Sequence, residues 1–116
     1  MSRPENSAAS IRALNDQTRL AGPQSTAAVR WVVTPGVTGL GPNALAEAIR
    51  QVQGFSAFDS ANDPHGEHDF GAFDVAGERL FWKIDYYDRS LSGGSLEPAN
   101  AAVTCRVLTL MLASEY

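Results

Sequence analysis

The chain has few cysteines for disulfide bonds and no long apolar stretches that could anchor it in a membrane. It has a single cysteine, Cys105, so no disulfide can form within it. No stretch approaches the roughly 20 apolar residues that cross a bilayer, and the opening MSRPENSAAS lacks the apolar core of a secretory signal. These absences argue against a disulfide-rich secreted protein and against a membrane protein. We expect a cytoplasmic protein that makes no membrane contact.

Basic residues are also scarce, and Lys83 is the only lysine. The chain has 9 basic and 13 acidic residues. Residues 59–88 carry eight of the acids against only Arg79 and Lys83, and residues 55–88 carry eight of the ten aromatics. An acidic and aromatic segment does not suit a nucleic-acid backbone, which needs clustered Lys and Arg. We expect no direct nucleic-acid binding and favour a basic protein partner or a cation.

The composition is sufficient for one folded unit. The 116 residues, 44% of them hydrophobic, can bury a modest core without the support of disulfide bonds. We predict a single α+β domain over residues 1–116, in which residues 1–7 are flexible.

The N-terminal half predicts a helix, a strand and a second helix. Ser7 or Ser10 can cap the first helix, which ends before Gly22 and the proline after it. The β-branched run VRWVVT is typical of a strand, and the glycine- and proline-rich PGVTGLGP predicts a loop. Pro42 suits the first turn of the second helix, and Gly54 closes that helix.

The C-terminal half predicts a β-hairpin and a last helix. HDFGAFDV and ERLFWKIDYYD flank Ala76-Gly77, where a two-residue turn can form. A wide apolar stripe through Val103, Val107 and Leu110 predicts a helix over residues 100–114. The fold class expected is α+β: a small antiparallel or mixed three-stranded sheet with a central hairpin and helices packed on one face, in the order α-β-α-β-β-α.

The turn at Ala76-Gly77 also sets the register of the hairpin. It places Asp74 opposite Arg79 and, further out, His68 opposite Asp85. Because side chains alternate between the two faces of a strand, one face is nearly all apolar and is predicted to face the core. That face holds Gly71, Phe73, Val75, Leu80, Trp82, Ile84 and Tyr86.

The other face, together with the segment NDPHGEHDFGAF before it, is the candidate functional surface. A carboxylate beside a histidine orients the ring for acid–base chemistry, so the candidate catalytic residues are His68, Asp85 and Lys83. No Gly-x-Ser-x-Gly motif or phosphate-binding loop accompanies them. The predicted binding surface comprises His65, Glu67, His68, Phe70, Phe81, Lys83, Asp85, Tyr87 and Asp88.

A metal site is the weaker interpretation of the same segment. Zinc needs three or four ligands, and His65 and His68 would have to borrow Asp85 or Asp88 from the partner strand. The helical His-Glu-x-x-His pattern is absent. We therefore expect no cofactor, with His65, His68 and Asp85 as the candidate ligands if zinc or another divalent metal binds.

Several segments together resemble a known family. NDPHGEHDFGAFDVAGERLFWKIDYYD, RVLTLMLASEY, IRALND and TPGV are similar to a small bacterial family called domain of unknown function 3768. The resemblance extends from about Ile11 to Tyr116. It implies a short, stand-alone cytoplasmic protein, often carried with accessory or mobile genes, but no established activity and no catalytic residues.

Two hypotheses of function follow from these observations. The first is a protein-interaction or regulatory module that uses the acidic and aromatic hairpin face, with a role as inhibitor of a host defence or regulatory complex suggested by the family's context. The second is a small metal-dependent or His/Asp acid–base hydrolase in which Asp85 orients His68. They differ in whether His65, His68 and Asp85 converge at one point.

Overall fold

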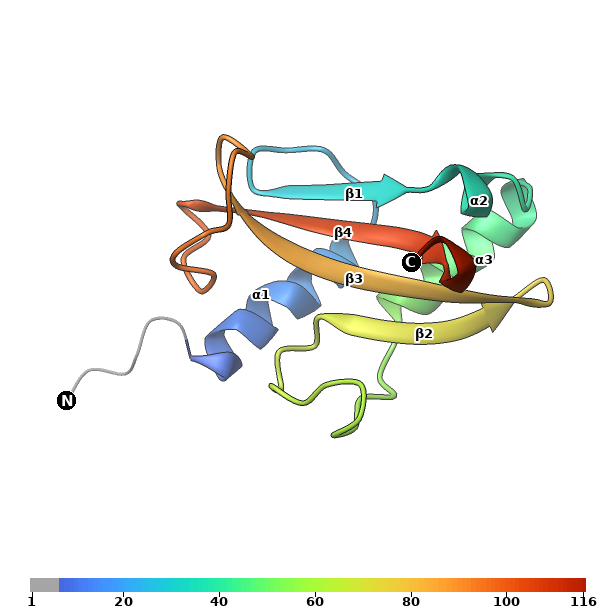
Figure 1. The fold of residues 1–116 in the computed structure, drawn as a ribbon, viewed down its shortest axis with the longest axis horizontal. Helices are drawn as coiled ribbons and strands as arrows, with labels where there is room; N and C mark the ends of the chain where they lie inside the picture. The colour runs from blue at the N-terminus through green and yellow to red at the C-terminus, as the bar shows by residue number, and fades with distance from the viewer. Residues whose placement is uncertain (1–6) are drawn as a thin grey trace.

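The protein has a mixed α+β fold built on a four-stranded sheet, as a computed structural model of residues 7–116 shows. The strands lie in the order β1-β4-β3-β2, and the helices α1 and α3 lie on one face of the sheet (Figure 1). The elements are α1 (Ala8–Ala21), β1 (Val29–Val33), α2 (Pro35–Thr38), α3 (Pro42–Gln53), β2 (Phe70–Val75), β3 (Glu78–Asp88), β4 (Thr104–Leu112) and the short 3-10 helix η1 (Ala113–Glu115).

The first helix begins where the sequence predicts. The side chain of Ser7 accepts the backbone N–H of Ser10 at 3.2 Å and caps α1. Gly22 follows the helix with a φ of 78°, a conformation that suits glycine. The predicted flexibility of residues 1–7 falls on residues 1–6, which lie outside the described residues, and on Ser7, which has this capping role.

The segment between β1 and α3 differs from the prediction. Instead of a loop throughout, PGVT forms the short helix α2. Pro35 suits a first helical position because its missing N–H is not needed there, and the N–H of Gly39 bonds to the carbonyl of Pro35 at 2.8 Å. The predictions of β1 and α3 are confirmed, and the α3 residues Ala48 and Val52 are fully buried.

The hairpin has the predicted register. Asp74 pairs with Arg79, and Gly71 pairs with Trp82. A Cβ atom at Gly71 would lie 2.3 Å from Nε1 of Trp82 and 2.8 Å from the ring of Phe55, so only glycine fits against this indole. The predicted core face is confirmed for Phe73, Val75, Leu80, Trp82 and Ile84, which are all buried.

The last predicted helix is a strand, which is the main error in the expected fold. Residues 104–112 form β4, which pairs antiparallel with β3 and parallel with β1. In β4 the buried residues Leu108 and Leu110 lie on one face and Met111 on the other, and a run that is apolar on both faces also satisfies a helical stripe. The sheet therefore has four strands rather than three, and the order α-β-α-β-β-α is wrong in its last element.

The main core lies between the sheet and the two helices. Its fully buried members include Val52 of α3, Trp82 of β3 and Leu110 of β4. Among residues 7–116, none of the helices combines the length and the apolar character that crossing a bilayer requires.

Candidate functional site

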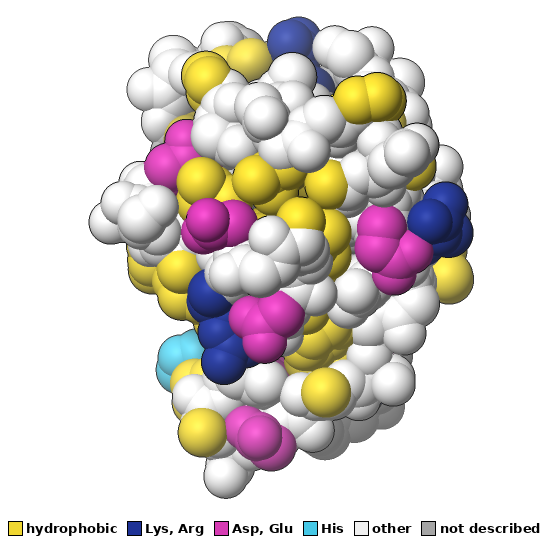
Figure 2. All heavy atoms as spheres, turned by 90° about the vertical axis from the view of Figure 1, so that its right-hand side faces the viewer, with side chains coloured by type: hydrophobic (Ala, Val, Ile, Leu, Met, Phe, Trp, Pro, Cys, Tyr) yellow, Lys and Arg dark blue, Asp and Glu magenta, His cyan; other side chains and the backbone are white. Residues whose placement is uncertain are grey.

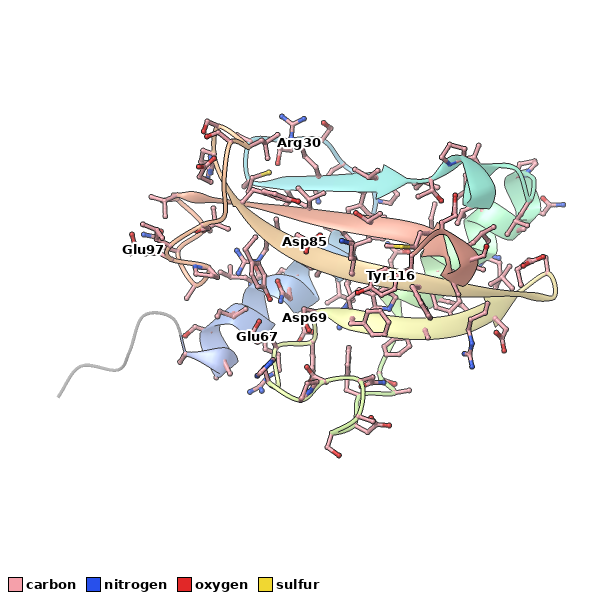
Figure 3. The ribbon with its side chains drawn as sticks, in the orientation of Figure 1. Arg30, Glu67, Asp69, Asp85, Glu97 and Tyr116 are labelled. Carbon is pink, nitrogen blue, oxygen red and sulfur yellow. The ribbon has the colours of Figure 1, made fainter. Side chains whose placement is uncertain are left out.

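The predicted binding surface is divided between two sides of the molecule. Phe70, Phe81, Lys83, Asp85 and Tyr87 keep to the outer face of the sheet, which α1 and α3 leave uncovered. Glu67 and His68 contact α1 instead. Figure 3 shows Asp85 over the middle of the sheet, whereas Glu67 and Asp69 lie beside α1. His65 is exposed in the turn before β2, and Asp88 ends β3.

The predicted pair of His68 and Asp85 does not form. The strand β2 begins at Phe70, and His68 has a φ of 55°, a left-handed conformation that takes it out of the strand. A carboxylate oxygen of Asp63 accepts the backbone N–H groups of Glu67 at 3.0 Å and His68 at 3.1 Å and holds this turn. Asp85 pairs instead with Lys83, with Nζ and Oδ2 2.9 Å apart.

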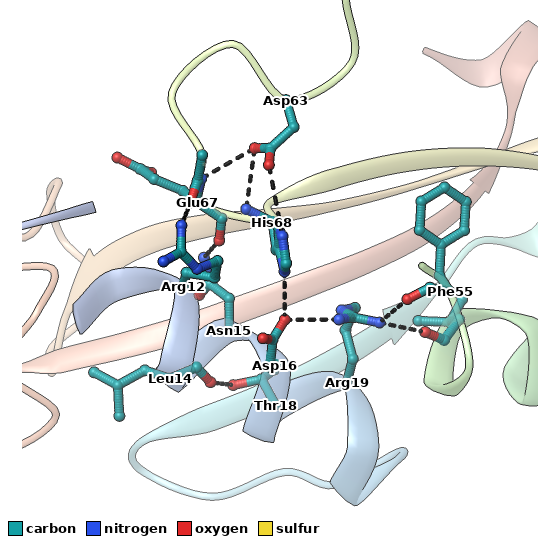
Figure 4. Close-up of polar contacts among 12 residues, drawn as sticks. Arg12, Leu14, Asn15, Asp16, Thr18, Arg19, Phe55, Asp63, Glu67 and His68 are labelled. Carbon is teal, nitrogen blue, oxygen red and sulfur yellow. Dashed lines mark hydrogen bonds and ion pairs between the residues drawn. The ribbon is translucent and has the colours of Figure 1, made fainter. Parts of the chain in front are cut away.

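The imidazole of His68 is held between the loop and α1 (Figure 4). Nδ1 of His68 lies 2.8 Å from Oδ1 of Asp16, and its ring stacks on Phe58 with centroids 3.7 Å apart. Burial by itself would raise the pKa of the Asp16 carboxyl, but its hydrogen bonds with His68 and Arg19 outweigh burial and hold that pKa below its ordinary value. An ionised carboxylate only accepts hydrogen bonds, so Nδ1 is the donor.

Arg19 extends this group of contacts to the end of α3. Its side chain donates to Oδ1 of Asp16 at 2.7 Å and to the backbone carbonyls of Val52 and Phe55 at 3.1 and 3.0 Å. Those carbonyls belong to the last turn of α3 and the residues after it, where helices leave acceptors without partners. The contacts among Asp63, His68, Asp16 and Arg19 thus tie the loop, α1 and α3 together.

A second polar group centres on Asn15, which the sequence analysis missed. Its amide donates to the carbonyl of Glu67 at 3.0 Å and to the hydroxyl of Tyr86 at 2.8 Å. Oδ1 of Asn15 accepts from Nε of Arg106 at 2.8 Å, and the Tyr86 hydroxyl donates to Glu67 at 2.7 Å. Burial and the bond to Glu67 raise the pKa of Tyr86 far above its ordinary value. The sequence did contain one signal for this role. Asn15 lies four residues after Ile11 and therefore on the same, buried side of α1.

These groups hold α1, α3 and the loop before β2 together, and the predicted acid–base pair of His68 and Asp85 is not formed. Within residues 7–116, no set of three or more His, Cys, Asp and Glu side chains is arranged to hold a metal ion. The candidate ligands His65, His68 and Asp85 point to separate surroundings. The hydrogen bonds of Asp63, Asp16 and Asn15 fix the loop before β2 against α1.

The outer face of the sheet contains an aromatic cluster at one end. The rings of Phe70 and Phe81 are 5.2 Å apart, and Tyr116 meets Phe81 edge to face at 5.6 Å. Next to this cluster, the hydrogen bond with Asp85 raises the pKa of Lys83. The face therefore combines this aromatic cluster with two ion pairs, Lys83 with Asp85 and Asp74 with Arg79.

A groove runs beside β2, between that strand and the end of α3. It has a volume of about 520 Å³, and ion pairs flank it: Glu47 with Arg50 at 2.7 Å, and Asp74 with Arg79 at 3.5 Å. Figure 2 views this end of the molecule and shows hydrophobic side chains between acidic and basic ones. The groove is lined by Glu47, Arg50, Gln51, Gly54, Phe55, Ala57, Ala72 and Phe73.

Comparison with known proteins places the chain in a family. No curated protein and no solved structure matches it. One family model, described as "Protein of unknown function (DUF3768)", matches residues 33–115, which include the three strands β2, β3 and β4 and the helix α3. Because that match covers most of the chain, the protein belongs to the family DUF3768.

Proposed function

We propose that this protein is a protein-interaction module that receives an extended segment of a partner protein as an added strand along β2. The observation that carries the proposal is the free edge of β2, with a partly apolar groove on one side and an aromatic cluster on the other. Strand addition is a common mode of peptide recognition, in which backbone bonds supply affinity and side-chain pockets supply specificity.

The backbone of β2 alternates between its neighbour and the open edge. The N–H of Ile84 bonds to the carbonyl of Asp69 at 2.9 Å, so Asp69 and every second residue after it bond to β3. The N–H and C=O groups of Phe70, Ala72 and Asp74 consequently point away from the sheet. Among residues 7–116, the only bond recorded to this outward set is a long one of 3.5 Å, from Gln51 to the carbonyl of Asp74.

The other edge of the sheet is covered, which makes β2 the better candidate. At β1, the N–H of Trp31 donates to the carbonyl of Gln24 at 2.9 Å, and Ser25 forms an isolated bridge with Arg30. Natural proteins protect most sheet edges in some such way. An edge strand of six residues without a comparable cover is suited to pairing with another chain.

The surroundings of β2 suggest the chemistry of the partner segment. Side chains of an added strand would alternate between the groove, where Phe55 and Phe73 lie, and the outer cluster of Phe70 and Phe81. The ion pairs nearby neutralise the charges of this surface. The partner segment should therefore be extended and rich in apolar side chains, and net charge should contribute little to its affinity.

The alternative hypothesis of a hydrolase lacks the pair of residues on which it was based. Its hypothesis needed Asp85 to orient His68, and these residues lie on different sides of the sheet. The more specific role of an inhibitor of a host defence or regulatory complex stays a prediction, as does the cytoplasmic location. A small module that occupies an extended segment of a larger assembly could serve that role.

The proposal can be tested with a random peptide library displayed on phage and selected against the purified protein. We expect selected peptides to be apolar and extended, and to slow amide hydrogen exchange at Phe70, Ala72 and Asp74. The variant Ala72→Pro removes one outward N–H without touching the bonds to β3, because proline is tolerated at an outward position of an edge strand. It should bind the peptides at least tenfold more weakly.

The matched control is Ala72→Ser, which keeps the N–H at the same position and adds only a hydroxyl to the groove that Ala72 lines. It should retain binding within a few-fold. Peptides that bind Ala72→Pro as well as the wild type, or that protect none of the three amides, would contradict the proposal. A library that yields no binder for a correctly folded protein would contradict it as well.

A further inference from the structure

A separate cavity lies on the helical side of the sheet, away from β2. It has a volume of about 270 Å³, close to the lower end of the roughly 300–1,000 Å³ usual for small-molecule sites. It lies between α1, the first residues of β1, and β4. The lining residues are Leu14, Gln17, Thr18, Ala21, Gln24, Ala28, Val29, Ala101 and Arg106.

Arg106 is the only charged residue in that lining, and no carboxylate of the described residues pairs with it directly, because Glu67 acts on its charge only from beyond the Tyr86 hydroxyl. The residue is 2% exposed. Its Nε donates to Oδ1 of Asn15 at 2.8 Å, one terminal nitrogen donates to the carbonyl of Pro98, and the guanidinium packs over the ring of Tyr86. These partners are uncharged groups. Within residues 7–116, no carboxylate lies at ion-pair distance from this guanidinium, and three of its five N–H donors have no recorded partner.

The other buried arginine shows how unusual this arrangement is. Arg19 is 5% exposed and faces a carboxylate of Asp16 at 2.7 Å. A buried charge without a counter-ion is costly, so buried arginines are normally paired. Burial lowers the pKa of Arg106, and the opposing effects of Tyr86 and Glu67 are too small to offset it, which reflects the same cost. A bound anion would remove it.

We infer that this cavity binds a small organic carboxylate, with the carboxylate against the guanidinium of Arg106 and an apolar body against Leu14, Ala21 and Val29. A carboxylate matches the planar guanidinium, which can donate two parallel hydrogen bonds to it. The mostly aliphatic walls favour an apolar body, and the volume limits it to a short chain. The site is independent of the proposed strand addition, because β2 contributes nothing to its lining.

The test uses straight-chain carboxylates from acetate to octanoate, with the amide of each acid as the uncharged counterpart. Binding is followed by calorimetry and by the NMR signal of the Arg106 Nε–H. We expect saturable binding that strengthens with chain length up to the limit of the cavity. Each amide should bind at least tenfold more weakly than its acid, and the Nε–H signal should move with the acids only.

Two variants test whether the carboxylates bind in this cavity. Arg106→Gln should abolish the preference for acid over amide. Because this change also disturbs Asn15 and can prevent folding, Ala28→Leu provides a second arm, since it fills the cavity and leaves Arg106 intact. It should weaken binding at least tenfold, whereas Ala13→Leu, at an exposed position of α1 outside the lining, should not.

Equal affinity for acids and amides would overturn the inference, and so would an unchanged affinity in Ala28→Leu. Failure of every carboxylate to bind would assign Arg106 a structural role alone, as a strut between Asn15 and the carbonyl of Pro98. The peptide-binding experiment at β2 would be unaffected by any of these results.

Discussion

The two faces of β3 place neighbouring residues in opposite environments. On the inner face, Leu80, Trp82 and Ile84 are at most 3% exposed and contact the helices and the core. On the outer face, which α1 and α3 leave uncovered, Phe81 lies in an aromatic cluster with Phe70 and Tyr116, and Lys83 pairs with Asp85. One strand therefore supplies both the stability of the fold and a surface that is open to a partner.

The comparison also separates two kinds of polar contact. On the inner side, the hydrogen bonds of Asn15 are largely shielded from water, so losing one leaves a buried group without a partner. On the outer side, the ion pair of Lys83 and Asp85 is partly exposed and can be replaced by water. Losing a polar contact should thus lower the free energy of unfolding far more on the inner side than on the outer side. The following substitutions test this difference.

The largest effect is expected from Trp82→Ala. The indole is fully buried, and truncation of a large core side chain costs about 3–5 kcal/mol in the free energy of unfolding. Leu110→Ala, also on the inner face, should cost about 2–5 kcal/mol. The control is Phe81→Ala on the outer face, which should cost about 1–2 kcal/mol because that ring is only half-buried. Denaturant melts check all three, and a cost below about 1 kcal/mol for Trp82→Ala would mean that the faces are inverted.

The next effect concerns Asn15→Ala. Removing this amide leaves the Glu67 carbonyl and the Arg106 guanidinium short of a partner in a buried setting, so we expect a loss of about 1–3 kcal/mol. Asn43→Ala, at an exposed position in α3, serves as the control and should change stability by less than about 0.5 kcal/mol. Similar values for the two variants in urea melts would show that the Asn15 contacts do not stabilise the fold.

A smaller effect should depend on pH through Asp16. Its pKa is lower in the folded protein than the ordinary value of about 3.9 expected in the unfolded chain. The stabilisation is therefore fully present above pH 4 to 5 and disappears as the pH falls through the folded pKa. The difference in unfolding free energy between wild type and Asp16→Asn should shrink between pH 5 and pH 2. A difference that stays constant over this range would contradict the assigned hydrogen bonds.

The smallest effect is expected at the outer ion pair. A double-mutant cycle of Lys83→Met and Asp85→Asn should give a coupling of about 0–1 kcal/mol, the usual value for exposed pairs. A coupling above about 2 kcal/mol would mean that this face is shielded from water and would weaken the contrast with the inner face.

The hairpin was predictable because two independent local signals agree. The Ala76-Gly77 turn and the alternation of apolar residues demand the same register, and the pairing of Gly71 with Trp82 follows from it. For β4 the local signals conflict. Leu108, Leu110 and Met111 are buried whether the chain is helical or extended, and only its place between two other strands decides the outcome.

The candidate site was less predictable, since it depends on contacts between distant segments. The register of the hairpin extends to Asp69, but the left-handed conformation of His68 then turns the chain toward α1. Asp16 and Asn15 lie 52 residues from their partners His68 and Glu67, and nothing in the local pattern links them. The sequence could not predict the free edge of β2 either, because that edge depends on β4 lying between β1 and β3.

The most direct test of the central claim is amide hydrogen exchange of β2 in the free protein, measured by NMR. If β2 has an open edge, the amides of Phe70, Ala72 and Asp74 should exchange much faster than those of Gly71, Phe73 and Val75, which bond to β3. An alternating pattern of this kind is the predicted result. Equal protection of all six amides would show that the edge is already covered and would contradict strand addition as the function of this protein.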